Sequence, residues 1–325
     1  MIVDDVGVVA IGRNEGGRLL RCLRSVRSES RNIIYVDSGS TDGSTEAAKE
    51  IGAHVIELDL VRPFSAGRAR NEGFAALRAL YPTTRFVQFI DGDCTLMPGW
   101  LEAARAFIDQ RREIAVVCGR RRELHPDASI YNRLCDIEWD TPVGETISCG
   151  GDALVRVEAF EAVGGFRTQL IAGEEPELCL RLRKFGWHIW RLDANMTEHD
   201  AAMTRIGQYW IRAVRGGYAY AEVSRLHQKS PYGIWRREMV RAVLWGGILP
   251  LFVCLGAAIN RAALVFALVY PFQVIRISWA RGPRSPQNWK YAVLITVAKF
   301  AEFQGVAKFY WRQLTGQSAE LIEYK

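Results

Sequence analysis

Residues Phe86–Trp100 read FVQFIDGDCTLMPGW, an apolar run that stops at two carboxylates, Asp91 and Asp93. The run Arg85–Ile90 predicts a buried strand with both acids at its carboxyl end. Two interpretations are open at this point. Asp-Gly pairs are common in tight turns, so the acids can simply end the strand. Alternatively, Mg²⁺ and Mn²⁺ prefer carboxylate oxygens, often together with substrate phosphates, so the pair can belong to a metal site.

Composition narrows the class of protein. The chain has 325 residues, 49% of them hydrophobic, which suffices for one large domain or two smaller ones. Its net charge of +6 suits an anionic membrane surface or a phosphate-rich substrate. The basic residues of the last third flank apolar runs instead of forming a polar stripe, so we expect no nucleic-acid partner. Seven cysteines without a Cys-x-x-Cys pair favour a reducing cytosol over a disulfide framework.

The first third of the chain alternates short apolar runs with helical patterns. Strands are expected at Val6–Ile11, Ile33–Val36, His54–Leu58, Arg85–Ile90 and Ile114–Val117. Helices are expected between them at Arg18–Arg27, Ser44–Ile51, Ala66–Leu80 and Pro98–Gln110. This alternation predicts a doubly wound α/β fold with a mostly parallel sheet, whose ligands bind at the carboxyl ends of strands. Asp37 ends the second strand there, as Asp91 and Asp93 end the fourth.

Two common nucleotide-binding patterns are absent after the first strand. The sequence there is AIGRNEGG, which contains neither the Gly-x-Gly-x-x-Gly fingerprint nor a P-loop. Nicotinamide chemistry and P-loop ATP chemistry are therefore not favoured.

The last third contains two apolar runs, Val243–Ile259 and Ala262–Ile275, separated by Asn260-Arg261. Each is short for a membrane span, which needs about 20 residues. Arginines flank both outer ends, which favours a hairpin with both ends in the cytoplasm: Arg236, Arg237, Arg241, Arg276, Arg281 and Arg284. A hairpin that crosses or dips into the membrane and a buried hairpin of a soluble domain are both open. Lys299–Tyr310 looks amphipathic and is predicted to lie on the membrane surface.

Several motifs follow one another between about Val6 and Asp200: AIGRNE, VDSGSTDGS, ARNEG, FIDGD, GGDALVRVEAFEAVGGF, GEEPELCLRL and TEHD. In this order they resemble the motifs of family 2 glycosyltransferases with the GT-A fold, the fold of nucleotide-diphospho-sugar transferases. The apolar hairpin and the tail ending in LIEYK are similar to members that build bacterial surface polysaccharides at the cytoplasmic membrane. The resemblance favours the metal interpretation of FIDGD over the turn interpretation.

The resemblance implies a domain organisation and a reaction. Residues 1–235 are expected to form the glycosyltransferase domain, with a nucleotide-binding half at 1–117 and an acceptor half at 118–235. A membrane-associated helical hairpin at 236–290 and an amphipathic tail at 291–325 would follow. The expected reaction is metal-dependent, inverting transfer of a sugar from a nucleotide-diphosphate sugar to an acceptor hydroxyl. The acceptor would be a lipid-linked saccharide at the cytoplasmic face of the bacterial inner membrane.

Roles carry over to matching positions. The nucleotide-sugar set is Glu15, Asp37, Asp42, Arg70, Asp91, Gly150, Gly151 and Asp152. The set expected to hold Mg²⁺ or Mn²⁺ is Asp93, Asp91 and His199. Structural alternatives stay open for three of these residues. Asp42 can cap the helix from Ser44, Arg70 can be a solvated helix charge, and a lone histidine such as His199 is more often structural.

Glu175 stands where the family usually has the catalytic Asp of a Glu-Asp pair. The resemblance implies a general base that takes a proton from the acceptor hydroxyl. Because Glu is one methylene longer than Asp, Glu174 remains a rival for that role. Acids near a helix start also favour the macrodipole, which gives a purely structural alternative.

Two departures from the family pattern affect the prediction. The usual Pro-x-Tyr after the first strand is replaced by Gly12 and Arg13, so stacking on the base is expected to differ. The Gln-x-x-Arg-Trp motif of processive synthases is absent, because Tyr-Trp-Ile-Arg follows Gln208. A single-addition transferase is therefore predicted. The alternatives are a sugar nucleotidyltransferase, for which GRNEGGR is a poor phosphate loop, and a catalytically inactive, membrane-tethered sugar-nucleotide-binding module.

Overall fold

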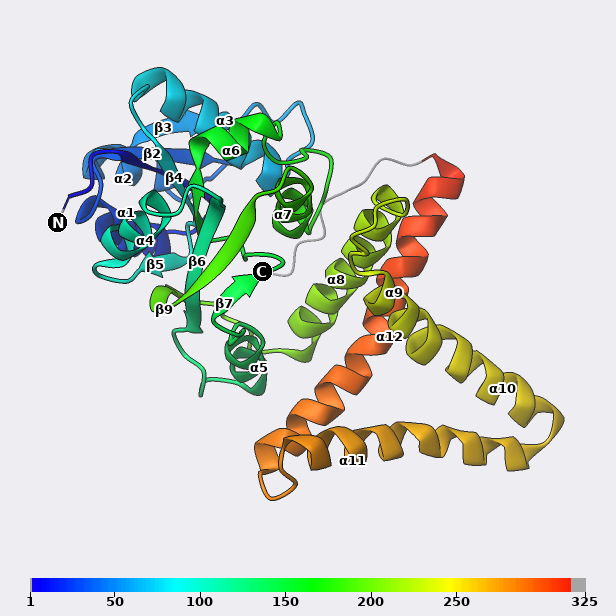
Figure 1. Cartoon of the computed structure of the whole chain (residues 1–325). Coiled ribbons are helices and arrows are strands. Elements are labelled where there is room, and N and C mark those ends of the chain that lie inside the picture. The colour runs from blue at the N-terminus through cyan, green and yellow to red at the C-terminus, as the bar shows by residue number, and fades with distance from the viewer. Residues whose placement is uncertain (1, 317–325) are drawn as a thin grey trace. The chain divides into compact units, whose positions relative to one another are not determined.

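The computed structural model describes residues 2–316, so the predicted tail beyond Gly316, including LIEYK, lies outside the described residues. Two compact units make up the described chain. The first consists of residues 2–126, Cys135–Leu170 and Glu174–Ala202, and it contains every described strand (Figure 1). The second consists of Asp127–Leu134, Ile171–Gly173 and the residues from Met203 onward. The domain boundaries given above stay a prediction.

The first unit is built on one mixed, mostly parallel sheet, which confirms the predicted α/β class. Its strands are β1 (Val6–Gly12), β2 (Asn32–Asp37), β3 (His54–Glu57), β4 (Phe86–Asp91), β5 (Cys94–Leu96), β6 (Ile114–Glu123), β7 (Gly144–Thr146), β8 (Ala153–Arg156) and β9 (His188–His199). Their order is β3-β2-β1-β4-β8-β6-β9-β5, and β7 pairs with β9. Strands β3, β2, β1 and β4 run parallel, whereas β8 runs antiparallel to both of its neighbours.

Helices connect these strands as the alternating pattern predicts. They are α1 (Gly17–Arg27), α2 (Ser44–Ile51), α3 (Ala66–Leu80), α4 (Trp100–Asp109), α5 (Ile130–Glu138), α6 (Val157–Ala162) and α7 (Glu174–Lys184). Helix α4 begins two residues later than predicted. Gly99 precedes it with φ of +80°, a left-handed conformation that ends any helical path through Pro98.

Helix α3 lies very close to the sheet because Gly73 has no side chain. A Cβ there would contact Val9 and Val36 at 2.5 and 2.7 Å. One residue on, Phe74 joins a cluster of aromatic rings. The Phe160 ring lies at its centre, with its centroid 4.6 Å from that of Phe74 and 5.2 Å from that of Phe89. Residues four apart share a helix face, so this packing also directs the preceding turn of α3 toward the carboxyl end of β4.

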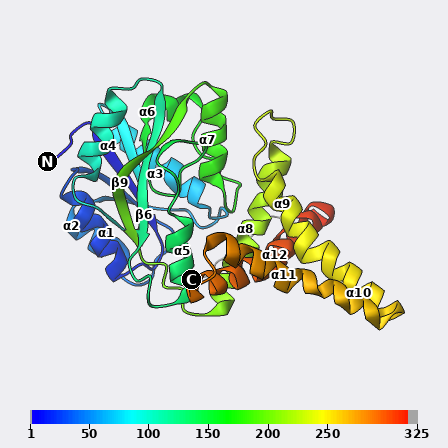
Figure 2. The same cartoon turned by 60° about the horizontal axis from the view of Figure 1, so that its bottom comes forward.

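Strand β6 is longer than predicted. The apolar pattern ends near Val117, but the strand continues to Glu123 through a polar stretch. It does so because it pairs with β9 over its whole length, with register shifts after Ile114, Cys118 and Arg120. Figure 2 shows the two long strands side by side. The extension brings polar side chains of β6 level with the end of β9.

The second unit is helical. Its elements are α8 (Ile206–Leu226), α9 (Arg236–Val243), a π-helical segment (Leu244–Ile248), α10 (Leu249–Ile259), a 3₁₀ helix (Arg261–Leu268), α11 (Val269–Arg281) and α12 (Pro286–Thr315). The π-helical segment lies just before Pro250. That proline has no N–H to donate to the carbonyl of Gly246, and its ring would clash with that carbonyl in an α-helix.

Figures 1 and 2 show the two apolar runs as two helical arms that meet at a turn. The arms are Arg236–Ile259, with 24 residues, and Arg261–Arg281, with 21, so each is long enough and apolar enough to cross a membrane. Both arms exceed the predicted runs because the helices continue into the flanking arginines. Phe252 and Phe272 are 59% and 66% exposed, so these arms are not the buried hairpin of the soluble alternative.

The segment Lys299–Tyr310 was predicted to lie on a membrane surface, and this is corrected. It is the middle of α12, and Val306 and Phe309 are buried in a cluster with Tyr218 and Ala221 of α8. The amphipathic pattern therefore reflects packing within the second unit.

Helices α8 and α12 meet almost backbone to backbone at two glycines. A Cβ on Gly217 would overlap the carbonyl oxygen of Glu302, and a Cβ on Gly305 would overlap that of Val214. By contrast, a Cβ on the neighbouring Gly216 would only reach Tyr220, at 3.9 Å.

We predict that Gly217→Ala lowers the stability of the second unit. Overpacking costs about 1–3 kcal/mol, which exceeds the gain of about 1 kcal/mol for replacing a helical glycine. The matched variant Gly216→Ala should be neutral or stabilising. Thermal unfolding of both variants in one detergent checks this, and equal melting temperatures would contradict the close crossing.

Candidate functional site

The sheet brings three of the sequence-predicted strand ends to one edge. Gly12 is the cross-strand partner of Asp37, and Ile11 is the partner of Asp91. Gly92 donates its backbone N–H to the carbonyl of Ile11 at 2.8 Å, which extends the contact one residue past β4. The candidate site is therefore built along the carboxyl ends of β2, β1 and β4.

Arg70 on α3 is the central cation of this site. Its guanidinium lies 2.8 Å from Asp91, 2.9 Å from Glu174 and 3.0 Å from Glu175. The Arg70 side chain is 2% exposed, so the alternative of a solvated helix charge is wrong. The physical reason is the packing of α3 through Gly73 and Phe74, which turns this helix face toward the sheet.

Arg121 on β6 is a second buried cation that the sequence did not reveal. It lies 2.9 Å from Asp91, 3.1 Å from Asp152 and 2.9 Å from the Cys94 sulfur. Its guanidinium also lies over the ring of Trp139, 5.3 Å from the centroid. The apolar pattern of β6 stops before Arg121, so only the pairing of β6 with β9 could have identified it.

These contacts set the charge of two acids. Burial alone would raise the pKa of Asp91, but Arg70 and Arg121 outweigh it and hold that pKa well below its usual range. Burial and the neighbouring charge of Glu174 raise the pKa of Glu175 to about 7, against the attraction of Arg70. Asp91 is thus a fixed anion, whereas Glu175 can take or release a proton near neutral pH.

The loop before β8 closes this cluster. Asp152 is fully buried and accepts hydrogen bonds from the Asp91 backbone N–H at 3.0 Å and the Thr197 hydroxyl at 2.7 Å. A Cβ on Gly151 would lie 2.7 Å from Asp91 and 3.2 Å from Glu175. Gly150 has open space around the same position. Gly151 therefore has a steric reason to be glycine, and Gly150 has none in the described residues.

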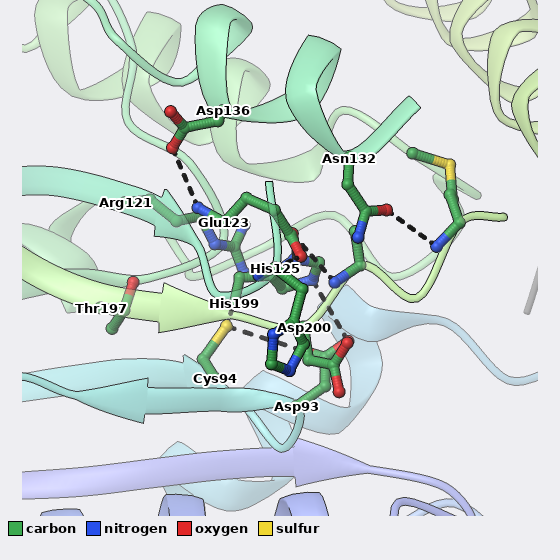
Figure 3. A network of polar contacts seen from close by, with 12 residues as sticks. Asp93, Cys94, Arg121, Glu123, His125, Asn132, Asp136, Thr197, His199 and Asp200 are labelled. Carbon is green, nitrogen blue, oxygen red and sulfur yellow. Dashed lines mark hydrogen bonds and ion pairs between the residues drawn. The ribbon is translucent and has the colours of Figure 1, made fainter. Parts of the chain in front are cut away.

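Asp93 and His199 form a second, separate pair. Nε2 of His199 lies 3.2 Å from Oδ2 of Asp93, and both side chains are buried. The pair is formed because His199 is the cross-strand partner of Cys94, the residue after Asp93. Figure 3 shows the imidazole beside Asp93 and Cys94.

This pair has the donor atoms that a divalent metal needs. Burial and the nearby Arg121 lower the pKa of His199, so its imidazole is neutral and retains a lone pair. A buried carboxylate and a neutral imidazole at 3.2 Å fit Mn²⁺ or Mg²⁺. The Cys94 sulfur lies within 4.8 Å of both donor atoms. Asp91 differs from Asp93, because each of its carboxylate oxygens already faces an arginine.

Asp37 lies at the β2 end of the edge, and Glu15 lies between it and β4, beside Gly12 and Gly92. Asp37 is 2% exposed and accepts hydrogen bonds from the Tyr35 hydroxyl at 2.9 Å and from the backbone of Gly39 and Ser40 at 2.9 and 2.7 Å. Glu15 pairs with Arg18 at 2.8 Å. Asp37 thus organises the loop that follows β2.

Asp42 stands apart from the other predicted residues. It is exposed, and its carboxylate accepts hydrogen bonds from the backbone N–H and the hydroxyl of Ser44, at 3.1 and 2.6 Å. The Ser44 hydroxyl lowers the pKa of Asp42. These contacts support the alternative in which Asp42 stabilises the start of α2. The N-cap residue itself is Gly43.

We predict that Arg70→Leu destabilises the first unit by about 3–5 kcal/mol at pH 7, because it leaves buried carboxylates without their partner. The matched variant is Arg78→Leu, also on α3, whose guanidinium pairs with Glu161 at 3.0 Å. That guanidinium also donates to the carbonyls of Pro82 and Thr84 at 2.8 and 3.1 Å. Because this variant leaves no buried carboxylate without a partner, it should cost less, at most about 2 kcal/mol. Denaturant unfolding compares the two, and equal losses would contradict the central role of Arg70.

Comparisons with known proteins bear on this arrangement. Residues 8–164 match the model of glycosyl transferase family 2. A pre-mycofactocin glycosyltransferase of Mycobacterium tuberculosis is 29% identical over 289 residues, 84% of this chain. The chain spans only 57% of that relative's length. The succinoglycan biosynthesis protein ExoA of Rhizobium meliloti is also 29% identical, over 87% of this chain and 85% of its own length.

One solved structure establishes the fold. The mannosyltransferase PcManGT from Pyrobaculum calidifontis, in complex with GDP-Man and Mn²⁺, aligns with a TM-score of 0.61. The alignment covers 95% of this chain and 88% of that one at 16% identity. The likeness confirms the predicted GT-A fold.

The matched segment runs from β1 to the turn after α6 and carries Asp37, Arg70, Asp91, Asp93 and Asp152. This segment, just under half of the chain, is similar to glycosyl transferase family 2.

Proposed function

We propose that the protein is a metal-dependent, inverting glycosyltransferase that moves a sugar from a nucleotide-diphosphate sugar to an acceptor hydroxyl. One observation carries the proposal. A partly buried acid that titrates near neutrality, Glu175, lies in one ion-pair network with Asp91, next to the separate Asp93–His199 pair. A family 2 transferase needs a base and a cation site in one place, and the network supplies candidates for both.

Glu175 is the proposed general base. It is 16% exposed against 5% for Glu174, so an acceptor hydroxyl can reach it more easily. Its pKa of about 7 leaves a large ionised fraction that can accept a proton at neutral pH. Glu174, which is bonded to Arg70 at 2.9 Å, holds the guanidinium in place.

The donor is proposed to lie along the strand ends. Asp37 and Glu15 would line the nucleoside. The open space at Gly150 would admit the sugar next to Gly151, which itself packs against Asp91 and Glu175. Asp93 and His199 would hold Mn²⁺ or Mg²⁺. When bound, such an ion neutralises the charge that grows on a diphosphate leaving group. Arg70 and Arg121 keep Asp91 ionised and correctly oriented throughout.

We expect wild-type protein to be stabilised by one class of nucleotide sugar only when Mn²⁺ is present, because a ligand of the folded state raises its stability. Asp93→Ala should abolish this stabilisation. The matched variant Asp193→Ala, at an exposed position of β9, should retain it. The measurement is a thermal-shift screen of UDP, GDP, CMP and dTDP sugars with and without Mn²⁺.

The outcome also separates the alternatives. No shift with any donor contradicts the proposed site. Donor binding without turnover, unchanged in Asp93→Ala, supports the inactive binding module. The sugar nucleotidyltransferase has no support beyond the general fold, because GRNEGGR after β1 is a poor match to a basic, glycine-rich phosphate loop.

A second prediction concerns pH. Because Glu175 must be ionised to accept a proton, kcat/KM should rise with pH and reach half its plateau near pH 7. Glu175→Gln should lower kcat by about 10²–10⁴-fold and leave donor affinity nearly unchanged. Steady-state kinetics from pH 5 to 9 measure both. If Glu174→Gln removes the pH dependence and Glu175→Gln does not, the base is Glu174.

The second unit supports a membrane location. The two apolar arms expose large side chains such as Phe252 and Phe272, and arginines flank their outer ends. Arginine at both outer ends favours a hairpin with both ends at the cytoplasmic face and near anionic headgroups. Together with the likeness to a succinoglycan biosynthesis protein, this supports a lipid-linked saccharide acceptor in surface-polysaccharide synthesis.

A further inference from the structure

Glu123 is a buried acid that neither the sequence motifs nor the proposed reaction uses. It is the last residue of β6 and the cross-strand partner of His199 on β9. The next residue, Leu124, donates its backbone N–H to the carbonyl of His199 at 2.9 Å. Side chains of cross-strand partners lie on the same face of a sheet, so Glu123 is held beside the imidazole (Figure 3).

The carboxylate of Glu123 is fixed by two backbone groups. One oxygen accepts the N–H of His125 and the other accepts the N–H of Ala201, both at 3.1 Å. Its side chain has no exposed surface. Ala201 comes two residues after His199, so the carboxylate anchors the backbone just beyond the imidazole. A carboxylate held in this way cannot move to another partner without losing these bonds.

The Glu123 carboxylate also faces the second nitrogen of His199. Its Oε2 lies 3.8 Å from Nδ1, and Nδ1 is buried with no hydrogen-bond partner among residues 2–316. The ring of Trp139 packs edge-on against the imidazole with centroids 4.8 Å apart. This contact restricts the ring rotation that would exchange the two nitrogens. Each nitrogen of His199 therefore faces one carboxylate, Asp93 on one side and Glu123 on the other.

An imidazole that binds a metal does so through the lone pair of one nitrogen, so only the other nitrogen can carry a proton. One of the two carboxylates beside His199 must then face the lone pair. With the proton on Nε2, the lone pair faces Glu123, whose position is fixed. With the proton on Nδ1, the lone pair of Nε2 points toward the Asp93 carboxylate. A cation between Nε2 and Asp93 would remove the repulsion between this lone pair and the carboxylate. Metal-bound histidines commonly donate their other N–H to a carboxylate in this way.

We propose that Glu123 is a positioning residue that fixes the proton of His199 on Nδ1, so that Nε2 and Asp93 together bind the divalent cation. This inference rests on the proposed function, because it assigns the support of that metal site. It identifies a carboxylate–histidine–metal arrangement in which the two acids on either side of His199 have different tasks. Asp93 contacts the cation, and Glu123 acts only through the imidazole.

The test measures Mn²⁺ affinity of the purified protein by titration calorimetry, independent of activity. Glu123→Gln keeps the size of the side chain and removes its charge, and it should raise the Kd for Mn²⁺ about 10–100-fold. The matched control is Glu145→Gln, which breaks another glutamate–histidine pair on β9, the 2.6 Å contact with the exposed His188. The control should bind Mn²⁺ like the wild type.

Glu123→Gln is also made in a His199→Ala background. This double variant separates an effect that acts through His199 from a general disturbance of the metal site. If Glu123 acts through His199, Glu123→Gln adds no further loss of Mn²⁺ affinity there. An equal further loss in that background overturns the proposal. In wild-type protein, the nitrogen coupling of His199 should appear in the electron spin echo of bound Mn²⁺ and weaken in Glu123→Gln.

A second measurement needs no variant. Nitrogen chemical shifts of ¹⁵N-labelled histidines in the metal-free wild type report which nitrogen carries the proton. A proton on Nδ1 of His199 supports the proposal, and a proton on Nε2 overturns it. Wild-type protein that binds neither Mn²⁺ nor donor would overturn the proposed function itself. Normal Mn²⁺ binding in Glu123→Gln would overturn only the role of Glu123.

Discussion

The site depends on the burial of one guanidinium, that of Arg70. Burying a cation is costly, and the structure offsets this cost with three carboxylates that come from β4 and α7. Arg121 adds a second cation and Asp152 a fourth acid. Four acids thus surround two arginines, and this excess of negative charge, together with burial, is why Glu175 holds a proton until about pH 7. The base and its counter-ions are one electrostatic system.

The two acids at the end of β4 illustrate how environment divides chemically identical groups. Asp91 is bonded to two arginines and serves as a fixed anion within the protein. Asp93, two residues on, faces a neutral imidazole instead. Strand β4 ends at Asp91, and Gly92 and Asp93 form the turn into β5. Asp91 therefore faces α3 and β6, whereas Asp93 faces β9. The FIDGD motif contains both acids, but the packing of the surrounding strands and helices determines which side chains each acid contacts.

The apolar periodicity was enough to predict β1, β2, β4, α3 and the acids at their ends, because buried strands and amphipathic helices have strong local patterns. It could not predict Arg121 or Glu123, which lie on the polar extension of β6 that only pairing with β9 keeps in strand form. The same limit explains α12, where an amphipathic pattern suggested a membrane surface and the actual partner is α8. Periodicity shows that one face of an element is covered, but it does not identify the partner that covers it.

In the second unit, helices α8 and α12 are held together partly by direct contact between their backbones. Its contact between α8 and α12 depends on Gly217 and Gly305, where the helices approach too closely for any side chain. Close approach of this kind gains dispersion energy without needing apolar residues at the contact itself. Apolar side chains such as Tyr218, Val306 and Phe309 pack beside this crossing. The two arms, by contrast, expose Phe252 and Phe272. A chain that packs its helices through glycine can keep a large apolar surface for a lipid environment, and such a surface would be a liability on a protein that stays in water.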